Sequence, residues 1–187
     1  AFGAKDDVYL LIKTVNADKD FEKKKRFEHY VKGLTNVEFR DIFLNKDEQL
    51  GLIKSSDCYI SLHRSEGLGL AMAEAMSFGK PVIATNYSGN LEFMNAENSF
   101  LVDFKLVSLS IEKYYYGSNQ VWAEPNVSHA ASLMCKVKSD NHLRLITSKK
   151  AAKDIRDRFS KERYQQFLFD RFEGLLKDED RGSDSRP

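Results

Sequence analysis

The chain has 187 residues, of which 42% are hydrophobic and 12% aromatic, and its formal net charge is +1. A chain of this size and composition can bury a core as one domain. The near-neutral charge gives no general attraction to nucleic acid or to an anionic membrane, and no apolar run approaches the roughly 20 residues that span a bilayer.

The cysteines and the chain start bear on the cellular compartment. Cys58 and Cys135 lack the spacing of a metal or redox motif, and no secretory signal is recognisable. Cys58 falls in a predicted strand, where we expect it to be a core residue. A reducing cytoplasm is therefore the expected location. The chain begins at Ala1 rather than Met, which indicates a fragment of a longer protein.

The first third of the chain predicts alternating strands and helices. Apolar runs predict strands over Val8–Thr14 and Val37–Phe43, and helical spacing of apolar residues predicts helices over Asp18–Leu34 and Asn45–Ser55. Asn45 is the expected N-cap of the second helix. The basic run Lys23–Arg26 has two interpretations, an anion-binding patch or a solvated helix face balanced by neighbouring glutamates.

The stretch DCYISLHRSEGLGLAMAEAMSFGKPVIAT, from Asp57 to Thr85, predicts one βαβ unit. Asp57–Leu62 is short and apolar, as expected of a strand covered on both faces. The polar loop His63–Gly67 follows, then a helix over Gly69–Met76, and a second strand over Pro81–Ala84. The polar loop falls at the carboxyl end of a strand, where open α/β sheets bind ligands.

This polar loop combines residue types that suit a diphosphate flanked by hydroxyl groups. Gly67 and Gly69 carry no Cβ, so a ligand can approach the backbone closely. The helix that begins near Leu68 or Gly69 directs free N–H groups at the loop, which suits phosphate. Glu66 and Glu74 flank the helix start, and carboxylates accept hydrogen bonds from hydroxyl pairs. A nucleotide sugar, with a diphosphate between two polyols, fits this arrangement.

The remaining chain predicts one further strand and several helices. A turn-rich loop, Asn86–Asn90, follows the βαβ unit and is expected beside the glutamate loop. The segment Phe104–Glu124 has no regular pattern and is interpreted either as an insertion that contacts another domain or an acceptor, or as a packed surface loop. The other predicted segments are a short helix Leu91–Met94, a strand Ser99–Asp103, helices Pro125–Lys138, Asp140–Phe159 and Ser160–Leu176, and a disordered polar tail over 178–187.

The segment SEGLGLAMAEAMSFGKPVIAT, in which seven residues separate Glu66 from Glu74, resembles the E-x7-E motif of family 4 retaining glycosyltransferases. The similarity continues in YSGNLEFM (Tyr87–Met94) and WAEPNVSHAASLM (Trp122–Met134). These enzymes have the GT-B architecture, in which two Rossmann-like domains face each other across a cleft. The resemblance implies that residues 1–177 form the C-terminal, donor-binding domain, a three-layer α/β/α fold with a central parallel sheet.

The resemblance also implies roles for individual residues. Glu66 would contact hydroxyls of the transferred sugar and is the expected catalytic residue, and Glu74 would hold the ribose. The expected donor-binding residues of the two loops are His63, Gly67, Leu68, Gly69, Leu70, Asn86, Ser88, Gly89 and Asn90. The nucleotide base would contact the loop after the second strand, at Ile42, Phe43 and Leu44.

The expected function is transfer of a hexosyl group from a nucleotide sugar to a hydroxyl acceptor, a glycan or a lipid-linked saccharide. No metal and no other cofactor are expected, since GT-B enzymes generally place no metal on the diphosphate. The expected partners are the nucleotide sugar, the saccharide acceptor and an N-terminal GT-B domain of the same protein, with no nucleic acid; peripheral membrane contact through the full-length protein stays open. The family's phosphate-binding Arg and Lys would precede Ala1, so we expect this fragment alone to be inactive.

Two other functions stay open. A GT-B sugar-nucleotide epimerase would share the fold and the phosphate-binding helix. A non-catalytic Rossmann-like interaction module would carry Glu66 and Glu74 as surface charge, directed away from any cleft. Fold alone does not distinguish these functions.

Overall fold

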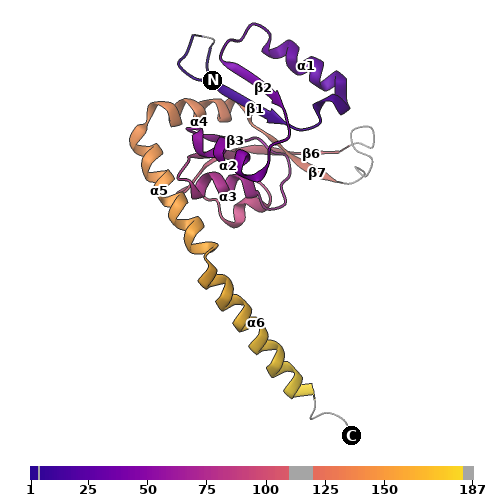
Figure 1. The fold of residues 1–187 in the computed structure, drawn as a ribbon, viewed down its shortest axis with the longest axis vertical. Helices are drawn as coiled ribbons and strands as arrows, with labels where there is room; N and C mark the ends of the chain where they lie inside the picture. The colour runs from indigo at the N-terminus through magenta and orange to yellow at the C-terminus, as the bar shows by residue number, and fades with distance from the viewer. Residues whose placement is uncertain (4, 110–119, 183–187) are drawn as a thin grey trace.

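A computed structural model describes residues 1–3, 5–109 and 120–182 and shows an α/β body from which one long helix projects (Figure 1). The strands are β1 (Leu10–Thr14), β2 (Val37–Asp41), β3 (Tyr59–Ser61), β4 (Val82–Thr85), β5 (Phe100–Val102), β6 (Phe104–Ser108) and β7 (Val121–Pro125). The helices are α1 (Phe21–Val31), α2 (Lys46–Ser55), α3 (Leu70–Ser77), α4 (Val127–Ser139), α5 (Asn141–Arg158) and α6 (Lys161–Gly182), with the 3-10 helices η1 (Ala17–Asp20) and η2 (Gly89–Glu92).

The parallel strands are hydrogen-bonded in two groups. β1 pairs with β2, while β3, β4 and β5 form a parallel sheet with β4 in the centre. β6 and β7 form an antiparallel pair of their own. The predicted α/β fold with parallel strands is confirmed, although its strands are not hydrogen-bonded as one continuous sheet.

Strand β4 lies at the centre of the core because it is buried on both faces. Val82 and Ala84 pack with side chains of α3 and α5, whereas Ile83, between them, packs in a second cluster with side chains of α4. Successive side chains of a strand point to opposite faces. Helices therefore cover both faces of this sheet, and a continuous apolar run rather than an alternating one is the sequence that suits β4.

Glycines set both ends of α3. Gly69 precedes the helix with a φ of 89°, and Gly79 follows it with a φ of 68°; both lie in the left-handed region that favours glycine. The Gly79 N–H donates to Met76 O at 2.9 Å and the Lys80 N–H donates to Ala75 O at 3.0 Å. This is the Schellman arrangement, and it ends the helix at Ser77, one residue after the predicted Met76.

The expectation of an irregular Phe104–Glu124 segment is wrong. The segment contains β6 and β7, whose register places Phe104 opposite Pro125 and Ser108 opposite Val121. Each strand is stabilised by a partner distant in sequence, which a local pattern does not reveal. The Tyr114–Tyr116 cluster of this segment lies outside the described residues.

Helix α6 extends beyond its predicted end. It was expected to end at Leu176 and continues to Gly182, so it overlaps the start of the polar tail expected over 178–187. The rest of that tail, 183–187, lies outside the described residues. Across the described ranges, none of the helices combines the length and apolar character that crossing a membrane requires.

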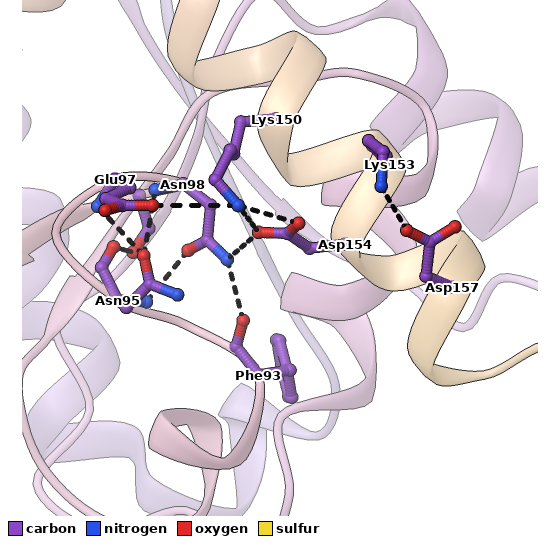
Figure 2. A network of polar contacts seen from close by, with 9 residues as sticks. Phe93, Asn95, Glu97, Asn98, Lys150, Lys153, Asp154 and Asp157 are labelled. Carbon is purple, nitrogen blue, oxygen red and sulfur yellow. Dashed lines mark hydrogen bonds and ion pairs between the residues drawn. The ribbon is translucent and has the colours of Figure 1, made fainter.

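A buried asparagine joins the segment after η2 to α5 (Figure 2). Asn98 is 1% exposed; its Nδ2 donates to Phe93 O at 3.0 Å and to Asp154 Oδ2 at 2.9 Å, and its Oδ1 accepts from the Asn95 N–H at 2.8 Å. Burial alone raises the pKa of Asp154, but hydrogen bonds from Lys150 and Asn98 outweigh it and hold that pKa below its ordinary value. This network fixes the segment that leads into β5.

We predict that Asn98→Ala lowers the free energy of unfolding by about 2–4 kcal/mol, because the buried Phe93 carbonyl and the Asp154 carboxylate lose a hydrogen-bond donor and a cavity forms at the buried Asn98. The matched control is Lys153→Met, which breaks the exposed pair of Lys153 with Asp157 on the same helix and should change the free energy by less than about 0.5 kcal/mol. Urea unfolding measures both variants. Equal losses would show that Asn98 is not a structural anchor.

Candidate functional site

The two predicted loops meet at the carboxyl ends of β3 and β4. The Gly89 N–H donates to Glu66 O at 3.2 Å. Ser88 Oγ donates to the same Glu66 O at 2.7 Å and accepts from the Glu66 N–H at 3.2 Å. The loop after β4 is thus bonded to the backbone of the expected catalytic residue, and the prediction that Asn86–Asn90 lies beside the glutamate loop is confirmed.

This contact leaves no room for a side chain at Gly89. A Cβ built there would lie 1.8 Å from Gly67 O, far inside the distance of any non-bonded contact. The preceding Ser88 has φ 81° and ψ −156°, a backbone region nearly restricted to glycine that costs of order 1–3 kcal/mol. The two hydrogen bonds between Ser88 and the Glu66 backbone offset that strain. Backbone geometry, more than side-chain packing, therefore fixes these loops together.

The start of α3 is uncapped and faces this contact. Gly69 provides no side-chain cap, and Leu70, the first helical residue, is 66% exposed. First-turn N–H groups have no intrahelical partner, and this end of a helix carries partial positive charge. Glu66 lies directly beside it, since its Cγ would be 3.5 Å from a Cβ built at Gly69. The helix start can therefore receive an anion, with a carboxylate at its edge.

Glu74, on the second turn of α3, is the only charged residue of that helix. Its side chain is 21% exposed, and Oε1 forms an ion pair with Lys46 Nζ. Oε2 is buried and has no hydrogen-bond partner among the described residues. A buried acceptor without a partner costs about 1–3 kcal/mol. Because Oε2 is shielded and Oε1 pairs with the exposed Lys46, a ligand would reach Glu74 from the Lys46 side.

Glu66 and Glu74 act on a common neighbour, Tyr59 of β3. Burial raises the pKa of Tyr59, and the negative charges of Glu66 and Glu74 raise it further. Both carboxylates thus disfavour the ionised form of this phenol. Tyr59 packs against the core cluster that includes Met72, Val82 and Ala151, as its place in an apolar strand predicts.

His63 and Asn90 brace the two loops from inside. His63 Nε2 faces two acceptors, Tyr87 O at 3.0 Å and Asn90 Oδ1 at 3.2 Å, so this nitrogen carries a proton. His63 Nδ1 lies 3.1 Å from Ser61 Oγ. Asn90 is fully buried, and its Nδ2 donates to Thr85 O at 3.1 Å. Both side chains are used within the protein, and their contacts with a donor stay predictions.

Arg64, the second residue of the polar loop, braces that loop against β7. Its guanidinium donates two hydrogen bonds to the Glu124 carboxylate, at 2.6 and 2.8 Å, and lies 4.7 Å from the centroid of the Trp122 ring. The Ala123 N–H donates to Arg64 O at 3.0 Å. Strand β7, which the sequence did not predict, thus supports the loop that carries Glu66.

The expected base-contacting loop follows β2. That strand ends at Asp41 rather than at the predicted Phe43, which places Ile42–Leu44 in the loop, and Phe43 is 83% exposed. Asn45 caps α2 as predicted, in a capping box with Glu48. The next residue, Lys46, joins this part of the chain to Glu74. Sequence reasoning missed Lys46, although a cation in the first turn of a helix opposes the helix dipole and could have indicated a contact elsewhere.

Neither a metal-binding cluster nor either of two surface hollows marks the candidate site among the described residues. Among the residues that the structure describes, no group of three or more His, Cys, Asp or Glu side chains is placed to hold a metal ion. Two hollows of the described surface lie elsewhere, one beside α1 and one at the junction of α5 and α6. Neither is lined by Glu66 or Glu74.

We predict that Gly89→Ala destabilises the chain by at least about 2 kcal/mol, because the new methyl group would overlap the Gly67 carbonyl. The same substitution at Gly51, inside α2 with no atom within 4 Å of a built Cβ, should stabilise by about 0.5–1 kcal/mol. Chemical denaturation measures both. A Gly89→Ala variant as stable as the wild type would contradict the described loop contact.

Solved structures with the same fold include known glycosyltransferases. The chain matches HepE from Anabaena in complex with UDP-glucose with a TM-score of 0.68 at 16% identity, over 89% of this chain and 41% of that one. It matches the C-terminal domain of the group 1 family protein LpcC from Francisella tularensis with a TM-score of 0.60 at 22% identity, over 76% and 65% of the two chains.

A third match is sucrose-phosphate synthase from Thermosynechococcus elongatus, with a TM-score of 0.64 at 18% identity, over 90% of this chain and 39% of that one. The chain thus spans about two fifths of HepE and of the synthase. At these identities the likeness shows the fold. No curated protein sequence matches the chain.

Family assignment comes from a separate comparison of the sequence. The family model described as glycosyl transferases group 1 matches residues 17–154, which is well over half of the chain and includes both glutamates and both loops. The chain therefore belongs to the glycosyl transferases group 1 family.

Proposed function

We propose that this chain is the C-terminal, donor-binding domain of a family 4 retaining glycosyltransferase with the GT-B architecture. In this proposal the full-length, cytoplasmic enzyme transfers a hexosyl group from a nucleotide sugar to a hydroxyl acceptor, a glycan or a lipid-linked saccharide. The observation that carries it is the uncapped start of α3, with Glu66 beside it and Glu74 on its second turn.

The comparisons support this proposal. HepE, which shares the fold, was crystallised with UDP-glucose, and the similar part of LpcC is described as a C-terminal domain. A chain that spans about two fifths of HepE accommodates one of the two domains of a GT-B enzyme. The N-terminal domain would supply the acceptor site and the cationic residues that contact the diphosphate.

The donor would lie along the start of α3. The diphosphate would accept hydrogen bonds from the backbone N–H groups of Gly67–Leu70, because these amides and the helix dipole favour an anion. The Gly67 N–H donates to Glu66 Oε1 at 3.0 Å in the structure, so the diphosphate would replace Glu66 as its acceptor. Glu66 would accept hydrogen bonds from hydroxyls of the sugar. Glu74 lies four residues beyond Leu70, about 6 Å along the helix axis, and would accept hydrogen bonds from the ribose. The loop Ile42–Leu44 would contact the base.

This placement accounts for the chemistry of transfer. As the bond between the sugar and the diphosphate breaks, negative charge grows on the leaving phosphate, and preorganised amides stabilise it without reorganisation. Retention of configuration would follow from front-side attack, in which the leaving phosphate accepts the proton of the acceptor hydroxyl. Glu66 then orients the sugar and stabilises positive charge on its ring rather than acting as a nucleophile. No metal or other cofactor is part of this proposal.

The two alternatives differ in what they require of the glutamates. An interaction module that carries them as surface charge predicts exposed side chains, whereas Glu74 is largely buried and both glutamates act on the half-buried Tyr59. A sugar-nucleotide epimerase would use the same donor site. Analysis of the products of the full-length enzyme, supplied with donor and with or without an acceptor, distinguishes an epimerised nucleotide sugar from a new glycosidic bond.

We predict that the chain binds one nucleotide sugar from a panel of UDP-, GDP- and ADP-sugars in isothermal titration calorimetry. Glu74→Ala should weaken that binding by at least about tenfold, since the ribose loses a charged acceptor. Glu28→Ala, an exposed glutamate of α1, is the control and should leave affinity unchanged. Equal and negligible binding of the whole panel by wild type and Glu74→Ala would count against the proposal.

A further inference from the structure

The ion pair between Lys46 and Glu74 joins two elements that serve different parts of the proposed donor. Lys46 is the first residue of α2 and follows the loop Ile42–Leu44 closely in the chain, whereas Glu74 belongs to α3. The two helices are in contact, and the pair bridges them at Glu74 Oε1. One interaction therefore links the segment expected at the base to the carboxylate expected at the ribose.

The position of Lys46 in its own helix is locally unfavourable. The amino end of a helix carries partial positive charge, so a cation in the first turn is repelled and an acid is favoured. The neighbouring first-turn residues, Asp47 and Glu48, follow that preference, and the capping box of Asn45 with Glu48 is complete without Lys46. The charge of Lys46 thus contributes nothing favourable to α2 and finds its partner on α3.

One polar contact orients the carboxylate of Glu74 among the described residues. Oε2 is buried without a partner, and within the described ranges Lys46 supplies the only hydrogen bond to this carboxylate. The terminal torsion of a glutamate side chain has a broad, roughly two-fold energy profile, so without Lys46 no polar contact among the described residues would fix the orientation of this carboxylate. Lys46 is itself 63% exposed, which places the pair at the side from which a ligand approaches.

We propose that Lys46 is a positioning residue that holds Oε1 of Glu74 toward the ligand, so that this carboxylate selects a nucleotide by its ribose hydroxyls. This inference rests on the proposed function, because it assigns the ribose to Glu74. A carboxylate oxygen has lone pairs for two donors, so Oε1 can accept from Lys46 and from a hydroxyl together. An exposed ion pair contributes little to stability. We therefore expect the loss of Lys46 to change the preference among nucleotides rather than the stability of the fold.

The test compares UDP, GDP and ADP with their 2′,3′-dideoxy counterparts by isothermal titration calorimetry on wild type and variants of this chain. Wild type should prefer the best-bound ribonucleotide over its dideoxy counterpart by at least about tenfold, since a lost hydrogen bond to a charged acceptor is of that size. Lys46→Met should reduce this preference below about threefold. The affinity for the ribonucleotide should fall, whereas the affinity for the dideoxy nucleotide should stay within about twofold of its wild-type value.

Two further variants separate positioning from charge and from folding. Lys54→Met removes the same charge from the exposed last turn of α2 and should keep the wild-type preference. Lys46→Arg keeps a cation opposite Glu74 and should restore most of it. Thermal unfolding of each variant should match wild type within a few degrees, as expected for an exposed pair.

The remaining outcomes overturn the inference in distinguishable ways. Equal weakening of both nucleotides by Lys46→Met would assign Lys46 to the phosphates or to general attraction. An unchanged preference would mean that Glu74 needs no positioning. If wild type binds ribonucleotides but Glu74→Ala keeps the preference, Glu74 does not read the ribose and this inference fails alone. If wild type binds no nucleotide, the proposed function fails with it.

Discussion

The close approach of two backbone segments, at Gly67 and Gly89, is the constraint on which the candidate site depends. No residue larger than glycine fits at position 89, and the strained Ser88 next to it is tied by its hydroxyl to the backbone of Glu66. Strain of this kind persists where surrounding contacts hold it and is concentrated at functional sites. It brings the loops after β3 and β4 together and leaves the start of α3 open beside Glu66.

Glu74 is the single charged residue of the largely apolar helix α3. Helices and β4 enclose this helix so that Met72, Ala75 and Met76 are buried, and a glutamate among them needs a partner. The structure provides one for Oε1, from Lys46, and none for Oε2. In the proposed site, a ligand hydroxyl that approaches beside Lys46 would be a second donor to Oε1. Strand β7, through its contacts with Arg64, stabilises the loop at the other end of the site.

The βαβ unit was predictable because its signals are local. A continuous apolar run, two glycines with left-handed backbone and a helix of small residues lie within one short stretch, and the structure follows them closely. The residues that complete the site were not predictable, because they depend on contacts across the chain. Lys46 acts on a helix other than its own, and β7 needs β6 as its partner. Local patterns thus predicted the βαβ unit and its glutamates, but not the residues elsewhere in the chain that contact them.

The central claim is that the start of α3 receives a diphosphate between Glu66 and Glu74. A crystal structure of the chain soaked with a nucleotide sugar tests it most directly. The account predicts phosphate oxygens within hydrogen-bond distance of the backbone nitrogens of Gly67–Leu70, sugar hydroxyls on Glu66 and ribose hydroxyls on Glu74. A nucleotide bound on another surface, with these amides facing only solvent, would contradict it.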